Sequence, residues 1–192
     1  MIDKTDKIMD AYKLAISARN FHLDHFNKWM TYYYVAVAAI FVAFYNLKDT
    51  CNSNIVYGLL ILGFLVSVLW HLSCKGYYFW TKNWLDIVLK FERQLSEEQA
   101  IYSLFSKRVK NENDKLYLPT QSANISTSKV TLLLSFIASW TWAFLIFDKI
   151  DSINIHTIYN ILFSLLTNIG LIFGLGLLLK SDISKHKLFD NQ

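Results

Sequence analysis

Four long apolar blocks constrain this sequence more than any other feature. They run over residues 29–47, 55–72, 130–147 and 158–179, and none of them contains Lys, Arg, Asp or Glu. A helix needs about 20 apolar residues to cross a hydrocarbon core of about 30 Å, and a charge at its centre costs roughly 2.5–3.5 kcal/mol on insertion. Four buried helices of a soluble bundle would show polar faces at a period of 3.6 residues, which these blocks mostly lack. We therefore expect four membrane-spanning helices.

The distribution of basic residues predicts the orientation in the membrane. Of 19 Lys and Arg residues, five precede residue 29, nine lie between residues 73 and 129, and three follow residue 179. The two short loops carry one each, Lys48 and Lys149. Because basic residues are retained on the cytoplasmic side, we expect a multi-pass protein of a bacterial inner membrane with both termini in the cytoplasm. The net charge of +4 then reports topology, and we expect no direct nucleic-acid partner.

The chain divides into one membrane domain and a small cytoplasmic layer, and the fold class is all-α. We expect a cytoplasmic N-terminal helix, a first hairpin of spans, a helical stalk that continues the second span into a loop, a second hairpin and a tail, over residues 1–28, 29–72, 73–128, 130–179 and 180–192. Within the stalk a further helix is expected over residues 96–108, before an irregular stretch that holds the single proline. Apolar residues recur at helical spacing on one face of the N-terminal helix and of the stalk. These two faces are formed by Ile8, Ala11, Tyr12, Ala15, Ala18 and His22, and by Tyr77, Trp80, Trp84, Val88, Phe91 and Leu95.

No pattern in the sequence predicts catalysis. Serine-hydrolase elbows, phosphate-binding loops, zinc-protease motifs and dinucleotide fingerprints are all absent from the sequence. His22 and His25 are three residues apart, but a metal site needs at least one further ligand of suitable geometry. We therefore expect no enzymatic activity, no cofactor and no metal.

The fourth block carries two features that suggest contacts. Gly170 and Gly174 are four residues apart, a spacing that lets helix backbones approach closely in lipid. Asn160, Ser164 and Asn168 lie on one helical face, where each amide needs a partner or water. The glycines are candidates for an assembly contact within or between chains. The polar residues line a narrow pore in one interpretation and bond to neighbouring helices in the other.

Two segments resemble small bacterial membrane proteins of the RipA type. The first leads into the first span with Arg19, Asn20 and Phe21. The second, just after the second span, carries Gly76, Trp80, Asn83, Trp84 and Glu92. The four-span membrane subunit of Kiwa-type defence is a second family of similar size and layout.

The resemblance implies a self-assembling, octameric effector of anti-phage defence that damages the inner membrane when a cytoplasmic partner protein triggers it. Arg19, Trp80, Trp84 and Glu92 are then candidates for assembly of the homo-oligomer in the bilayer. One alternative is a scaffold or sensor that recruits a soluble effector without conducting. A small-solute transporter is a third, weaker alternative, since such proteins usually carry paired repeats with broken helices at mid-membrane.

Overall fold

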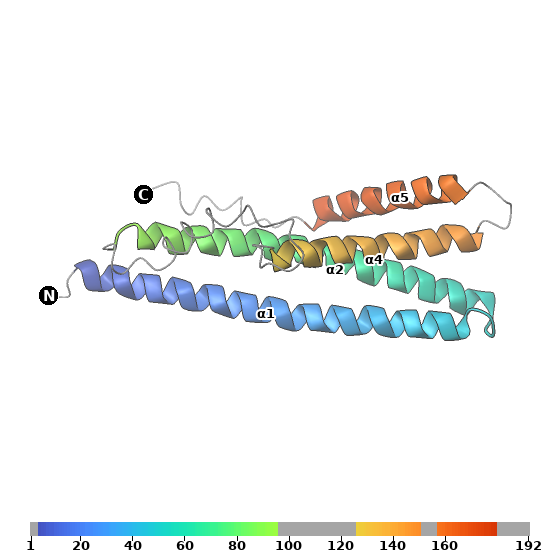
Figure 1. Ribbon diagram of the computed structural model, residues 1–192, viewed down its shortest axis with the longest axis horizontal. Helices are drawn as coiled ribbons and strands as arrows, with labels where there is room; N and C mark the ends of the chain where they lie inside the picture. Colours follow the sequence, from blue (N-terminus) through green and yellow to red (C-terminus); the bar gives the residue numbers. More distant parts are fainter. Residues whose placement is uncertain (1–3, 96–125, 151–156, 180–192) are drawn as a thin grey trace, which may run out of the picture. The chain divides into compact units, whose positions relative to one another are not determined.

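The computed structural model describes residues 4–95, 126–150 and 157–179, and all its regular elements are helices. These are α1 (Lys4–Leu47), α2 (Ser53–Glu92), α4 (Thr127–Ile150) and α5 (Thr157–Leu178) (Figure 1). Each is long and apolar enough to cross a membrane. The predicted all-α class with four spans is therefore confirmed. The predicted helix over residues 96–108, most of the irregular stretch after it and the tail lie outside the described residues.

Both long helices continue without a break from a polar segment into an apolar one. α1 contains neither proline nor glycine over its 44 residues, so nothing in its sequence interrupts the backbone hydrogen bonds between the N-terminal helix and the first span. α2 covers 40 residues and joins the second span to the stalk in the same way. The predicted continuation of the second span as a stalk is confirmed.

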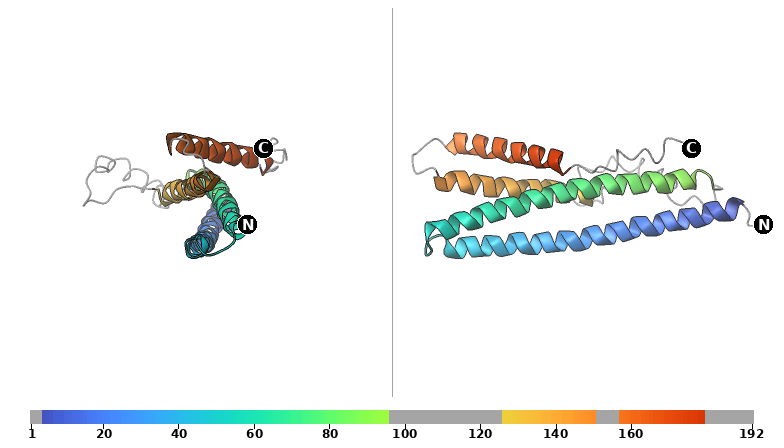
Figure 2. Two further views of the ribbon diagram at one scale, coloured as in Figure 1. Left: turned by 90° about the vertical axis from the view of Figure 1, so that its right-hand side faces the viewer. Right: turned by 180° about the vertical axis from the view of Figure 1, so that it is seen from behind.

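A tight turn connects these two helices, as Figures 1 and 2 show. The amide N–H groups of Lys48 and Cys51 donate to the carbonyl oxygens of Phe44 and Leu47, which closes the end of α1. The side-chain oxygen of Asn52 accepts the N–H of Asn54 at 3.1 Å. This is the usual role of an asparagine at a helix start, because the first amides of a helix have no partner within it.

The chain forms two compact units. The first is drawn from Met1–Tyr34 and Ser73–Leu134, and the second from Val35–Leu72 and Ser135–Gln192. In the first unit the start of α1 packs on the end of α2. Its core consists of Tyr12, Ala15 and Val88, with Phe91 and Leu95 partly buried against it. The apolar stripes predicted for both helices supply these residues.

The second unit has the larger core, to which all four helices contribute. Its buried members are Phe44, Val56, Leu60, Phe64, Val68, Trp142, Ala143 and Ile172. Trp142 is fully buried at its centre, stacked on Phe41 with ring centroids 4.1 Å apart and meeting Phe44 edge-on at 5.8 Å. A Cβ built on Gly63 would lie 2.5 Å from the Trp142 ring, so only glycine allows α2 to approach the indole this closely.

Candidate functional site

Six buried polar side chains lie on the inner faces of three helices of the second unit. We call this group the polar seam; it consists of Ser67 and His71 on α2, Ser135 and Ser139 on α4, and Ser164 and Asn168 on α5. On each helix the two members are four residues apart, which places them on one side one turn apart. All are fully buried except His71, which is 6% exposed. A polar stripe on each helix is thus turned inward, away from lipid.

Hydrogen bonds connect the seam between neighbouring helices. His71 Nδ1 and Ser135 Oγ are 3.1 Å apart, joining α2 to α4. The indole N–H of Trp140 donates to Ser164 Oγ at 3.1 Å, joining α4 to α5. The same Ser164 hydroxyl donates to the carbonyl oxygen of Ile161 at 2.9 Å. A buried polar group in an apolar surrounding needs such partners, because desolvation without them costs about 1–3 kcal/mol.

The centre of the seam lacks such partners. Within the described part of the chain, neither the nitrogen nor the oxygen of the Asn168 amide has a hydrogen-bond partner, and the Ser67 hydroxyl has none. Two contacts fix the antiparallel register of α2 and α4: His71 with Ser135, and Gly63 against Trp142. In that register Ser67 lies level with Ser139. The seam therefore holds polar groups that are buried away from lipid and have no hydrogen-bond partner in the described protein.

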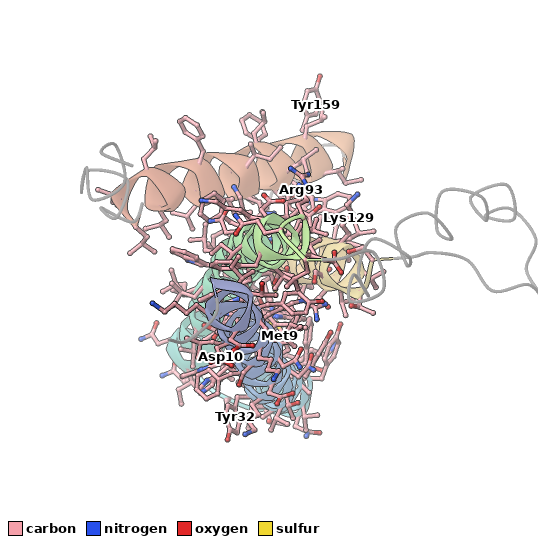
Figure 3. All side chains as sticks on the ribbon, turned by 90° about the vertical axis from the view of Figure 1, so that its left-hand side faces the viewer. Met9, Asp10, Tyr32, Arg93, Lys129 and Tyr159 are labelled. Atoms are coloured by element: carbon pink, nitrogen blue, oxygen red, sulfur yellow. The ribbon has the colours of Figure 1, made fainter. Side chains whose placement is uncertain are left out.

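α5 is only weakly enclosed by the rest of the subunit. Of its most apolar stretch 17% is buried, the same fraction as for α1, compared with 28% for α4 and 44% for α2. A shallow groove of about 270 Å³ is lined by Trp140, Thr141 and Phe144 of α4 and by Ile161 of α5. The labelled Tyr159 on α5 projects away from the helix in Figure 3. The helix that carries Asn168 is thus held by few contacts.

The structure separates the predicted pore-lining residues. Ser164 and Asn168 are buried within the subunit, whereas Asn160, two turns before Asn168, is partly exposed. They remain candidates for lining a pore, but two of them are turned inward in this conformation. The sequence interpretation missed Ser67 and His71 of α2 as further buried polar residues of the second unit. The sequence contains a pattern that could have indicated them, since Ser67 and His71 are four residues apart in an otherwise apolar block.

The predicted assembly glycines lie on an open surface of α5. A Cβ on Gly170 or Gly174 would meet no described atom within 4 Å, whereas one on Gly176 would meet Leu72 at 3.7 Å. Gly176 therefore packs against α2 within the subunit, and the other two leave space for something outside it.

The predicted assembly residues of the first unit have different surroundings from one another. Glu92 is 3% exposed and accepts the Tyr12 hydroxyl at 3.4 Å, so it contributes to packing within the subunit. Arg19 is half-buried and donates from Nη1 to the side-chain oxygen of Asn20 at 3.3 Å. Trp80 and Trp84 are half-buried. Their part in assembly stays a prediction.

Tyr77 lies where the two helices of the first unit converge. Its ring contacts those of His22 and Phe26 at centroid distances of 5.1 Å each, and its carbonyl oxygen lies 3.5 Å from His22 Nε2. Burial and the nearby Tyr33 raise the pKa of the Tyr77 phenol above its ordinary value of 10.0. The phenol therefore stays neutral at any physiological pH, and its raised pKa lowers stability only in strong alkali, as the pH rises past 10.

Among residues 4–95, 126–150 and 157–179 no three His, Cys, Asp or Glu side chains are grouped as metal ligands would be. His22 contacts Tyr77, and His25 stacks on Phe21 with ring centroids 4.7 Å apart. These histidines have packing roles in the first unit.

Four helices long and apolar enough to cross a bilayer, three of which carry buried polar residues, define a multi-pass membrane protein. Residues 9–150 match the model of the octameric membrane protein family (8xMP). This match covers well over half of the chain, and the protein belongs to that family. It therefore belongs to a family of proteins that assemble as octamers in a membrane. No curated protein and no solved structure matches the chain.

Proposed function

We propose that this octameric membrane protein is a non-enzymatic component of bacterial anti-phage defence that permeabilises the inner membrane when a cytoplasmic partner triggers it. The defence role is supported by the RipA-type resemblance of the segments around Arg19–Phe21 and Gly76–Glu92. The inner membrane and cytoplasmic termini are supported by the charge distribution, with seventeen basic residues on one side and two on the other.

One observation supports permeabilisation most directly: the unsatisfied amide of Asn168. An unpartnered buried amide raises the free energy of the closed packing by about 1–3 kcal/mol. A rearrangement that brings water to Asn168 and Ser67 recovers this energy. The polar seam is then the closed form of a conduit, and α5, with its small buried fraction, is the helix that moves.

In the open state the polar stripe of α5, from Asn160 through the buried Ser164 and Asn168, turns toward water. The Trp140–Ser164 hydrogen bond is the contact between α4 and α5 that must break. Eight copies would supply eight such stripes around one axis. Uncharged hydroxyl and amide groups suit a conduit of weak selectivity, since selective filters use rings of carbonyl groups or charges.

Replacing Asn168 with leucine tests this proposal. The N168L substitution places in the seam an apolar side chain with the same branching and the same number of heavy atoms, so we expect a more stable closed subunit and loss of conduction. The matched control is T167V, at the neighbouring exposed position. Cells expressing each variant are infected with a phage against which the wild-type protein protects, and membrane potential is followed with a dye.

We expect early depolarisation with the wild type and with T167V, and an intact potential with N168L. Protection without any depolarisation in the wild type would remove the pore and favour a scaffold that recruits a soluble effector. Absence of protection against every phage of a broad panel would remove the defence role itself.

A further inference from the structure

The first unit has a face that nothing described in the chain covers. Its two helices are antiparallel, and their register follows from Tyr12 bonding to Glu92, Phe26 contacting Tyr77, and Cys74 lying 3.4 Å from Met30 through their sulfur atoms. In this register Phe21 lies about level with Lys82, and Leu14 with Leu89.

Large apolar side chains on α1 point away from α2. Leu14 is 71% exposed and Phe21 66%, and their spacing of seven residues puts them on one side of the helix. Ala18 and His25 lie beside them on the same flank, and His25 stacks on Phe21.

α2 presents a matching flank of its own. Gly76, Trp80, Asn83 and Ile87 follow one another at steps of four, three and four residues. A Cβ on Gly76 would meet no described atom within 4 Å, and Ile87 is partly exposed. On both helices this flank is turned by a similar angle, in the same sense, from the side that contacts the other helix. Because the two helices are antiparallel, the two flanks then lie on one face of the pair. We call the combined surface the open face: Leu14, Ala18, Phe21, His25, Gly76, Trp80, Asn83 and Ile87.

The open face lies away from the start of α4. Figure 3 looks along the helix pair and shows Met9 on the side of Lys129 and Asp10 on the other side. Asp10 is four residues before Leu14 and eleven before Phe21, so it shares their side of α1. Four of the positions that carry the family resemblance, Phe21, Gly76, Trp80 and Asn83, belong to this face.

Lipid does not reach most of this face. Phe21 lies eight residues before the apolar block that begins at Trp29, and Leu14 lies fifteen before it. At 1.5 Å per residue these are about 12 Å and 22 Å from the hydrocarbon edge. The headgroup layer extends only about 5–8 Å beyond that edge. A cluster of apolar side chains standing in water marks an interaction surface.

We propose that the open face is the surface by which each subunit binds the next copy of this chain in the octamer. Copies inserted in one orientation are related by rotation about an axis along the membrane normal, so the ring contact is heterologous and joins two different surfaces. Such a rotation does not change a residue's position along the membrane normal, so two residues that meet at the interface must lie at the same depth. The receiving surface is the opposite flank of the same helix pair, on the side of α4 but beyond its first residue, where Lys82 and Leu85 of α2 are exposed.

The proposal rests on the octameric family to which the chain belongs and is independent of the permeabilising role. The proposal about the interface and the proposal about the conduit can therefore be disproved separately.

Disulfide cross-linking between introduced cysteines tests the interface. The background is C51S, which keeps the buried Cys74. The variants are F21C alone, K82C alone, the two singles co-expressed, and the F21C/K82C double variant, each oxidised in membranes. We expect no cross-link in either single, dimers from the co-expressed pair, and a ladder of up to eight subunits from the double. The matched control is N20C/K82C, whose two cysteines share the opposite flank, and it should give no ladder.

The proposal is overturned if the double variant gives no ladder, if N20C/K82C gives an equal one, or if F21C alone forms dimers, which would mean that two open faces meet. A second measurement is the mass of the complex in detergent. F21E should lose the octamer while retaining the helical content of the wild type by circular dichroism, and the apolar replacement F21L should keep both. An F21E protein that remains fully octameric would assign the open face to another occupant, such as a soluble partner.

Discussion

The two units of this subunit treat polar groups in opposite ways. In the first unit the buried carboxylate of Glu92 accepts a hydroxyl from Tyr12, while large apolar side chains such as Phe21 remain exposed. In the second unit the apolar core closes around Trp142, while the amide of Asn168 is buried without a partner. The first unit thus leaves apolar side chains uncovered on its surface, and the second leaves a polar side chain without a hydrogen-bond partner in its interior. This difference is what the two proposals require: octamer assembly buries the exposed apolar face of the first unit, and activation brings water to the buried amide of the second.

The largest expected effect concerns the apolar core of the second unit. W142A removes a fully buried indole that stacks on Phe41 and Phe44. We expect a loss of about 3–5 kcal/mol of unfolding free energy in detergent, because the cavity cannot be refilled. The control is W29A in the first unit, where the indole is 48% exposed and should cost less than about 1 kcal/mol. Equal losses would mean that the two units do not differ in packing.

A smaller effect is expected from overpacking the same region. G63A places a Cβ against the Trp142 ring, which is held by its other neighbours, and should destabilise the subunit by about 1–3 kcal/mol. The control is G58A, where an added Cβ meets no described atom within 4 Å. G58A should be neutral or slightly stabilising in the same thermal unfolding measurement, since alanine favours the helix by up to about 1 kcal/mol. Destabilisation by both variants to the same extent would point to the helix backbone and not to the indole.

The smallest effect is expected in the first unit. Y12F removes the hydroxyl that donates to Glu92 and should lower stability by about 1 kcal/mol, the usual net value of one hydrogen bond. Tyr32, labelled in Figure 3, projects into the surroundings and is 65% exposed, so Y32F serves as the control and should change nothing measurable. If Y12F is as stable as Y32F, the buried carboxylate does not depend on this bond.

Hydropathy was sufficient to predict the four spanning helices, because charges are excluded from hydrocarbon by several kcal/mol. The continuation of the second span was predicted from the helical spacing of apolar residues after it. Hydropathy could not predict which side of each span faces protein. Lipid tails and a protein core are equally apolar, so the pattern of the third apolar block does not distinguish the buried Trp142 from its exposed neighbour Ile137.

The candidate site was predicted only in part, for a similar reason. Asn160, Ser164 and Asn168 were recognised as one stripe because polar residues stand out in an apolar block. The seam residues of α2 were missed, because the burial of Ser67 and the contact of His71 with Ser135 on α4 depend on tertiary packing. The surroundings of Glu92 also depend on packing, because its bond to Tyr12 joins residues 80 positions apart.

The polar seam has a consequence for how the protein is made. Its groups are contributed by α2, α4 and α5, and the indole N–H of Trp140 on α4 has its hydrogen-bond partner, Ser164, on the last helix. A nascent chain that ends before Thr157 leaves this indole N–H without that partner. Membrane quality control that recognises such groups would remove truncated products before they join intact octamers.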